Sequence, residues 1–327
     1  MVCSVVLEHC VGSFAGEMLV EDVEIESGSS EMGECSKREF RRRLRFKRMP
    51  NLIQTEIRVV PEEDFGSDHV GIGKVDFRPD IQVLVHPYLA PMVAGLYLIS
   101  SCIEERIRSG FRPKALCIGV GGGALLAFLK SQLGFEVVGV EADEEVLRVA
   151  RRFFGLDGND SIRVIVGDAI NVIEKLAYRA NGHNLCSFGV NEAENGNCLY
   201  DSNDINNKFD AIMVDLDSSD ATTGTVAPPL EFVRKHVLLA AKLVLCDFGV
   251  LVINVISPNR SFYEKLIHDL QEVFHDLYEI DIGNGENFVL VATMSAAMSS
   301  ISECDNSFLI RLRLVVSGVY MDSLRKI

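Results

Sequence analysis

From Lys114 onward, short apolar strands alternate with amphipathic helices, and this alternation restricts the fold more than any other feature. Five strand–helix units are expected, at 115–120 with 124–133, 136–140 with 144–154, 162–166 with 170–177, 211–215 with 230–244, and 250–255 with 262–274. Strands that alternate with helices imply βαβ units, and therefore a parallel sheet covered by helices.

Both ends of this region are expected to contain antiparallel strands. Leu277–Asp281 and Phe288–Thr293 flank Gly283-Asn284-Gly285, which is typical of a hairpin turn. Alternating residues on either side of Met49-Pro50-Asn51 predict another hairpin over 41–60. The expected fold class is therefore α/β: a doubly wound, mostly parallel sheet with a terminal antiparallel hairpin, preceded by a small N-terminal β-hairpin region.

Changes in composition divide the chain into four parts. They are an acidic, poorly ordered segment at 1–40, N-terminal β-strands and a helix at 41–110, the α/β domain at 111–295 with a flexible polar insertion at 179–207, and a tail or helix at 296–327. Within the second part we expect a strand pair over 70–77 and 81–85 and a helix over 90–107. A last helix is expected over 308–324.

Charge restricts the partners. The formal net charge is −15, which argues against direct nucleic-acid binding and leaves room for a basic protein or a cationic substrate. The basic run Arg41–Arg48 is interpreted as the solvated face of an edge strand. Docking of an acidic partner on that run is the alternative.

The cysteines and the apolar stretches bear on the compartment. None of the nine cysteines forms a Cys-x-x-Cys motif, so we expect no metal site and a reducing compartment. The longest apolar stretch, Val237–Ile256, contains Lys242 and Asp247, and the N-terminus lacks the pattern of a signal peptide. The expectation is a cytoplasmic protein with no membrane partner.

A glycine-rich turn, Gly119-Val120-Gly121-Gly122-Gly123, follows one expected strand and opens the next helix. Glycines let a ligand approach the backbone, and the N–H groups at a helix start favour an anionic or polar ligand. Glu141 ends the following strand, where a carboxylate can accept hydrogen bonds from ribose hydroxyls. This pattern fits a nicotinamide dinucleotide and S-adenosylmethionine equally well.

Acidic residues also end the next two strands. Asp168-Ala169 follows the third strand, where Asp168 can face a ligand or cap the helix that follows. Asp215, Asp217 and Asp220 follow the fourth strand. Carboxylates at this edge of a parallel sheet face the ligand crevice. The alternative is a purely structural role, in which Ser218, Ser219 and Asp220 only cap the loop and the next helix.

Three stretches carry a family resemblance. They are Cys117–Ala124, Val140–Asp143 with Val149–Gly155, and Val214–Asp220 with Pro228–Val233. Over roughly residues 40–295, less the insertion, the chain resembles the spermidine synthase-like branch of class I methyltransferases. Within that branch the likeness is greatest to the C-terminal module of the elongation factor 1-alpha lysine and N-terminal methyltransferases.

The resemblance implies a fold that binds S-adenosyl-L-methionine or its decarboxylated form. It assigns the cofactor to Gly119, Gly121, Gly123, Glu141, Asp168, Ala169 and Asp215, and the acceptor amine to Asp217 and Asp220. It also implies a protein substrate, such as a translation elongation factor methylated on its N-terminal α-amine or on lysine. The sequence leaves open whether the protein forms a homodimer.

The chain departs from the spermidine synthase pattern at two points. Ala124 stands near the place of an Asp, and Asp215-Leu216 precedes Asp217-Ser218-Ser219-Asp220. Which of the three Asp residues is catalytic is therefore open. The leading prediction is an amine methyltransferase, with a polyamine aminopropyltransferase and a non-catalytic cofactor-binding scaffold as alternatives.

Overall fold

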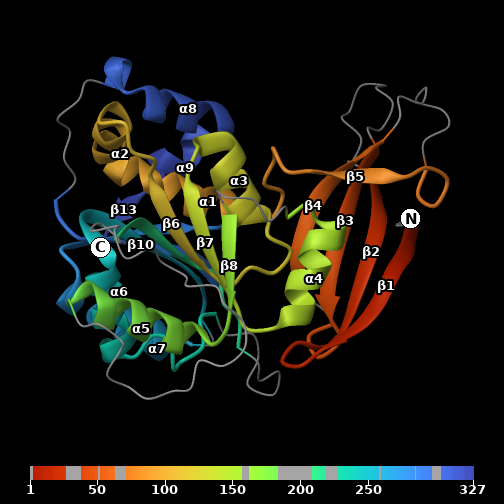
Figure 1. Ribbon diagram of the computed structural model, residues 1–327, viewed down its shortest axis with the longest axis horizontal. Helices are drawn as coiled ribbons and strands as arrows, with labels where there is room; N and C mark the ends of the chain where they lie inside the picture. The colour runs from red at the N-terminus through yellow and green to blue at the C-terminus, as the bar shows by residue number, and fades with distance from the viewer. Residues whose placement is uncertain are drawn as a thin grey trace.

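A computed structural model describes residues 3–26, 38–50, 52–62, 71–156, 162–182, 208–218, 227–257, 259–283, 285–296 and 303–327. In these residues the chain forms two β-sheets with helices around the larger one (Figure 1). The smaller sheet is antiparallel, and its strands are β1 (Cys3–Gly12), β2 (Gly16–Glu26), β3 (Arg38–Phe46), β4 (Ile53–Pro61) and β5 (Phe77–Asp80).

The larger sheet has eight strands in the order β13-β11-β12-β10-β9-β6-β7-β8. Their bounds are β6 Lys114–Ile118, β7 Glu136–Glu141, β8 Ile162–Val166, β9 Phe209–Val214, β10 Leu245–Ile256, β11 Asp276–Asp281, β12 Asn287–Thr293 and β13 Arg325–Lys326. Strands β10, β9, β6, β7 and β8 pair in parallel, and β12 runs antiparallel between β10 and β11. The predicted fold class is confirmed.

The helices that follow β6, β7, β8 and β10 agree closely with the expected positions, whereas the one after β9 begins at Lys235 instead of residue 230. The helix expected over 90–107 is divided into three shorter ones. The helix bounds are α1 Leu89–Ala94, the 3₁₀-helix η1 Gly95–Ile99, α2 Ser100–Arg108, α3 Ala124–Leu133, α4 Glu144–Phe153, α5 Ala169–Ala180, α6 Lys235–Val244, α7 Arg260–Val273, the 3₁₀-helix η4 Glu303–Asp305, α8 Ser307–Val315 and α9 Gly318–Asp322. In the described residues, no helix is long and apolar enough to cross a membrane.

Two apolar cores cover the two faces of the large sheet. Because side chains alternate along a strand, Ala115 and Cys117 of β6 face one core while Leu116 and Ile118 face the other. Helices α1, α3 and α8 pack in the first core, and α5, α6 and α7 pack in the second (Figure 1). This arrangement leaves the carboxyl ends of the parallel strands accessible to a ligand.

A third core joins the small sheet to the larger body. Helix α4 lies beside the small sheet (Figure 1), and its Val146 and Val149 pack with Met18, Leu44 and Ile57 of strands β2 to β4. The side chains of these five residues are all buried. The small sheet is therefore held against the large domain at the helix that follows β7.

The N-terminal region differs from the sequence expectation. Residues 3–26 form two paired strands instead of a poorly ordered segment, because Met18, Val20 and Val23 bury apolar side chains. The expected strand pair over 70–85 is also wrong, since the single strand β5 pairs with β4. Residues 183–207, most of the predicted insertion, lie outside the described residues. At the other end, the helix expected over 308–324 is split into α8 and α9.

The arginine run does not lie on an edge strand. Strand β3 lies between β2 and β4, and its arginines pair with carboxylates of the neighbouring strands. Arg43 Nε lies 2.6 Å from Glu56 and Arg45 Nε lies 2.7 Å from Glu21. The edge-strand interpretation was wrong because it considered the run alone, without the acidic residues on either side.

The most buried of these pairs joins Arg42 to Asp22. The guanidinium donates from Nε at 2.7 Å and from Nη2 at 2.9 Å to the two carboxylate oxygens. Its Nη1 also donates to the carbonyl of Phe153 at the end of α4, at 2.8 Å. The pair therefore fixes the small sheet to α4.

We expect Arg42→Met to destabilise the protein by about 3–5 kcal/mol, because it leaves the Asp22 carboxylate buried without its cation. Urea unfolding measures this effect. The double variant Arg42→Met/Asp22→Leu is expected to recover most of the loss, and Arg260→Ala, at an exposed ion pair, to change stability by at most about 0.5 kcal/mol. A double variant no more stable than Arg42→Met would contradict this assignment.

Candidate active site

A cavity of about 450 Å³ lies at the carboxyl ends of the parallel strands, between the large sheet and the small one. Seven of the predicted site residues line it, namely Gly119, Gly121, Glu141, Asp168, Ala169, Asp215 and Asp217. Gly123 is not among the lining residues, and Asp220 lies outside the described residues. The volume is within the usual range for small-molecule sites.

The glycine turn between β6 and α3 has a backbone that side chains cannot adopt without strain. Gly119 and Gly121 have φ of 87° and 51°. A Cβ on Gly119 would lie 2.1 Å from the carbonyl oxygen of Asp215, and one on Gly121 would lie 2.7 Å from Thr55 Oγ1. The turn therefore requires glycine for its own packing, whether or not a ligand is bound.

Gly123 packs closely against the residues behind the turn. It is the N-cap of α3, with φ of 82°, and a Cβ there would meet the side chain of Leu156 at 2.8 Å. Its position supports close packing behind the turn. A role of Gly123 in cofactor binding stays a prediction.

Glu141 faces the glycine turn from the end of β7. Its Oε2 accepts the N–H of Val120 at 3.1 Å and that of Gly121 at 3.3 Å, while Oε1 accepts the N–H of Asp143. Burial raises the pKa of Glu141, although these three backbone donors favour the charged form. The side chain thus links the turn to the beginning of α4.

Asp143 fastens the β1–β2 turn to the site, a role that sequence reasoning missed. It caps α4 through the N–H of Glu145, and its other oxygen accepts the N–H groups of Phe14 and Ala15 at 2.7 and 2.8 Å. Burial opposes ionisation, yet the pKa of Asp143 is lowered because these backbone donors stabilise its charge. The β1–β2 turn consequently forms one wall of the cavity.

Asp168 and Ala169 lie at the start of α5. Asp168 is the N-cap, and its Oδ1 accepts the N–H of Asn171 at 2.9 Å. The capping role considered from the sequence is therefore present. Because Asp168 also lines the cavity, its capping leaves a ligand-facing role open.

Asp215 and Asp217 follow β9 and have different surroundings. Asp215 accepts the Nδ2 of Asn254 at 3.0 Å and the hydroxyl of Tyr88 at 3.1 Å, one hydrogen bond on each carboxylate oxygen. Asp217 lies 3.7 Å from Arg48 Nη2. Burial raises the pKa of both carboxyls, and the charge of Arg48 partly offsets this for Asp217.

Several buried polar atoms on the cavity wall have no hydrogen-bond partner among the described residues. They are Arg48 Nε, Gln54 Nε2, His86 Nδ1, Asp217 Oδ2 and Asn254 Oδ1. Buried donors and acceptors are normally paired, and leaving them unpaired is costly. A polar ligand in the cavity would satisfy such a group of atoms.

Sequence reasoning missed the contributions of residues 14, 48, 54, 55, 86 and 88, all of which line the cavity. The available signal was weak, since these residues belong to the N-terminal strands and the segment before α1. Arg48 was included only in a basic run, and nothing in its spacing indicated contact with Asp217.

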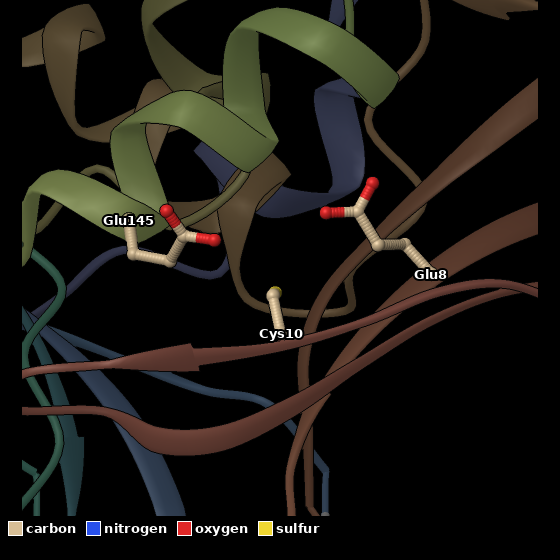
Figure 2. Close-up of side chains that lie close together, drawn as sticks. All are labelled: Glu8, Cys10 and Glu145. Carbon is tan, nitrogen blue, oxygen red and sulfur yellow. The ribbon is translucent and has the colours of Figure 1, made fainter.

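A cluster of possible metal ligands lies apart from these residues. Glu8, Cys10 and Glu145 offer ligand atoms within 4.8 Å of one another, and Figure 2 shows them converging between β1 and α4. Arg148 donates hydrogen bonds to both carboxylates, and Arg152 lies 2.9 Å from Glu8. The cations already balance the acidic charge, so we interpret the cluster as an ion-pair contact between β1 and α4.

Comparisons with known proteins fit this geometry. No family model matches the chain. It is 28% identical to the eEF1A lysine and N-terminal methyltransferase of Xenopus laevis over 95% of this chain and 42% of that protein, and 26% identical to the Mus musculus protein over 85% and 37%. The chain is therefore similar to these methyltransferases over most of its own length. It spans about two-fifths of their length.

Solved structures agree with the relationship. Human methyltransferase-like protein 13 in complex with S-adenosylhomocysteine (SAH) has a TM-score of 0.54 and 25% identity, covering 71% of this chain and 92% of that one. A probable spermidine synthase from Corynebacterium glutamicum has a TM-score of 0.52 over 95% of this chain, but at 14% identity it shows only the fold. The resemblance found in the sequence is confirmed.

The buried acids make stability at the site depend on pH. The pKa of Asp217 is raised in the folded protein, which therefore binds this proton more tightly than the unfolded chain does. Ionisation of Asp217 consequently reduces the free energy of unfolding as pH rises above the pKa that the group has in the unfolded chain. We expect Asp217→Asn to raise the urea midpoint at pH 7, and expect the gain to vanish as pH falls toward about 4.

Asp143→Asn provides the opposite control. The pKa of Asp143 is lowered in the folded protein, so its ionised form stabilises the fold at any pH above the pKa that the group has in the unfolded chain. The substitution is therefore expected to lower the urea midpoint at pH 7. This loss should disappear as pH falls through the pKa of Asp143 in the folded protein. Shifts of the same sign at pH 7 for both variants would contradict the two environments described above.

Proposed function

We propose that the chain is an S-adenosyl-L-methionine-dependent methyltransferase that methylates an amine of a protein. The observation that carries the proposal is the group of unpartnered polar atoms in a cavity bounded by the glycine turn and Glu141. Additional support comes from the relatives, which are named as methyltransferases, and from the human neighbour, which holds SAH.

The residues of the cavity suit the cofactor. Gly119 and Gly121 line the cavity, and Glu141 accepts the N–H of Gly121 at 3.3 Å. By the family resemblance, Glu141 would hold the ribose hydroxyls and Asp168 with Ala169 would lie along the adenine. Asn254 Oδ1 is a buried acceptor left for a ligand among the described residues.

Bound S-adenosyl-L-methionine would supply a methyl group made electrophilic by its sulfonium sulfur. The task of the protein is to hold an amine with its lone pair free and to accept a proton from it. Asp217 is better suited than Asp215, because Tyr88 and Asn254 already occupy the two oxygens of Asp215. Asp217 Oδ2 is buried and without a hydrogen-bond partner in the described part of the chain.

The protonation of the acceptor favours a protein N-terminus. An α-amine has a reference pKa of about 7.7–8.0 and lysine about 10.4, so freeing the lone pair at pH 7 costs about 1 kcal/mol for the first and about 5 kcal/mol for the second. The charge of two neighbouring carboxylates would attract either cation. Because the relatives are named for both reactions on eEF1A, we propose a translation elongation factor as the substrate class.

Two alternatives are less well supported. A polyamine aminopropyltransferase has only the fold of the C. glutamicum protein in its favour. A non-catalytic scaffold would not need an unpartnered carboxylate oxygen in the cavity.

We further propose a cytoplasmic location, in keeping with six free cysteines in the described residues. That the protein forms a homodimer stays a prediction.

We expect Glu141→Ala to weaken SAH binding by about 10- to 100-fold, because the cavity loses a charged hydrogen-bond acceptor. The rise in melting temperature on adding SAH measures this affinity through linkage. Glu144→Ala, an exposed neighbour on α4, is the control and should keep the full rise. Equal rises for Glu141→Ala and the unsubstituted protein would contradict the role of Glu141.

Methyl transfer itself is tested with labelled S-adenosyl-L-methionine and three acceptors: cell extract, peptides with free N-termini, and polyamines. We expect label in protein and peptide, and a loss of at least about 100-fold in kcat for Asp217→Asn. Asp220→Asn is assayed separately, because either residue was predicted to face the amine.

Label in polyamines alone would replace protein methylation with a small-molecule reaction. SAH binding without transfer to any acceptor would favour the scaffold, and full activity in both Asp variants would remove the proposed proton acceptor.

A further inference from the structure

Arg48 reaches the cavity from the small sheet, just after β3 ends. Its Nη1 donates to the backbone carbonyl of Ser218 at 3.1 Å, and its Cζ lies 5.0 Å from the ring centre of Phe46. These two contacts fix the plane of the guanidinium. The side chain is therefore held in place before any ligand binds, which lowers the entropy cost of using its remaining donors.

Arg48 and the neighbouring Asp217 each leave one polar atom without a hydrogen bond among the described residues. Arg48 Nε and Asp217 Oδ2 are both buried and have no hydrogen-bond partner among the described residues. Arg48 Nη2 lies 3.7 Å from Asp217 Oδ2, too far for a direct hydrogen bond between them. The pair is complementary to a ligand that carries an N–H donor and an oxygen acceptor close together.

We infer that Arg48 recognises the acceptor by donating its Nε–H to a carbonyl oxygen next to the amine that faces Asp217. A peptide N-terminus has this arrangement, because one carbon separates its α-amine from its first carbonyl. A polyamine or a lysine side chain has no oxygen near its amine. Arg48 thus favours a peptide N-terminus over the other two amines, and this inference rests on the proposed function.

The role of Arg48 is in binding. A guanidinium donates hydrogen bonds and does not act as a general base, so Arg48 does not take the proton of the acceptor amine. Lysine at this position would keep the positive charge near Asp217 but would lose the fixed planar donor. Arg48→Lys therefore separates recognition of the carbonyl from the charge effect on Asp217.

A mutant cycle between enzyme and substrate tests the contact. One acceptor is a short peptide with a free N-terminus that the unsubstituted protein methylates, and the other is the same peptide with its first carbonyl replaced by a methylene group. Arg48→Lys and removal of the carbonyl are each expected to lower kcat/KM about 10- to 100-fold, mainly by raising KM. Both changes together should lower it no further than either alone.

Arg43→Lys is the matched control. Arg43 lies on β3, pairs with Glu56 at 2.6 Å and does not line the cavity, so its substitution should leave KM unchanged for both acceptors. Melting temperatures of the two variants show whether either substitution disturbs the fold.

Independent, multiplicative losses in the cycle would overturn the inference, as would an Arg48→Lys variant equally impaired on both acceptors. Transfer to polyamines or lysine side chains but to no peptide amine would also overturn it while methyl transfer stands. Absence of transfer to every acceptor would overturn the proposed function and this inference with it.

Discussion

The structure of the site depends on a glycine turn that has no room for side chains. Gly119 packs against the backbone of Asp215, and the N–H of Gly122 donates to Thr55 Oγ1 at 2.8 Å. A Cβ on Gly122 would lie 2.5 Å from Thr55 Cγ2. The turn therefore brings β6, β9 and the small sheet together, and the acidic residues that line the cavity take their positions from this contact.

The small sheet is consequently part of the site. Asp143 holds the β1–β2 turn, Thr55 contacts the glycine turn, and Arg48 holds the loop after β9. These contacts involve the β1–β2 turn, β4 and the segment after β3, and all three line the cavity. In the large domain alone, the carboxyl ends of the parallel strands would be exposed. The small sheet covers these ends, encloses the cavity and adds polar groups to its wall.

The sequence predicted the large domain well because its information is local. Each strand–helix unit carries its own hydrophobic period. Gly119, Glu141 and Asp168 lie at or just after the carboxyl ends of strands, and these ends must share one edge of the sheet. The N-terminal region was predicted poorly because its stability comes from pairs distant in sequence. Arg42 is buried only because Asp22 faces it across the sheet, and neither residue alone indicates this. The same reason explains why Arg48 was missed beside Asp217.

The central claim is that the glycine turn and Glu141 enclose an adenosyl sulfonium compound. Isothermal titration calorimetry of the unsubstituted protein with S-adenosyl-L-methionine, its decarboxylated form and NAD tests it most directly. We predict saturable binding of S-adenosyl-L-methionine, at least about ten times tighter than that of NAD, a difference of about 1.4 kcal/mol. Tighter binding of NAD, or no heat from S-adenosyl-L-methionine at millimolar concentration, would contradict it.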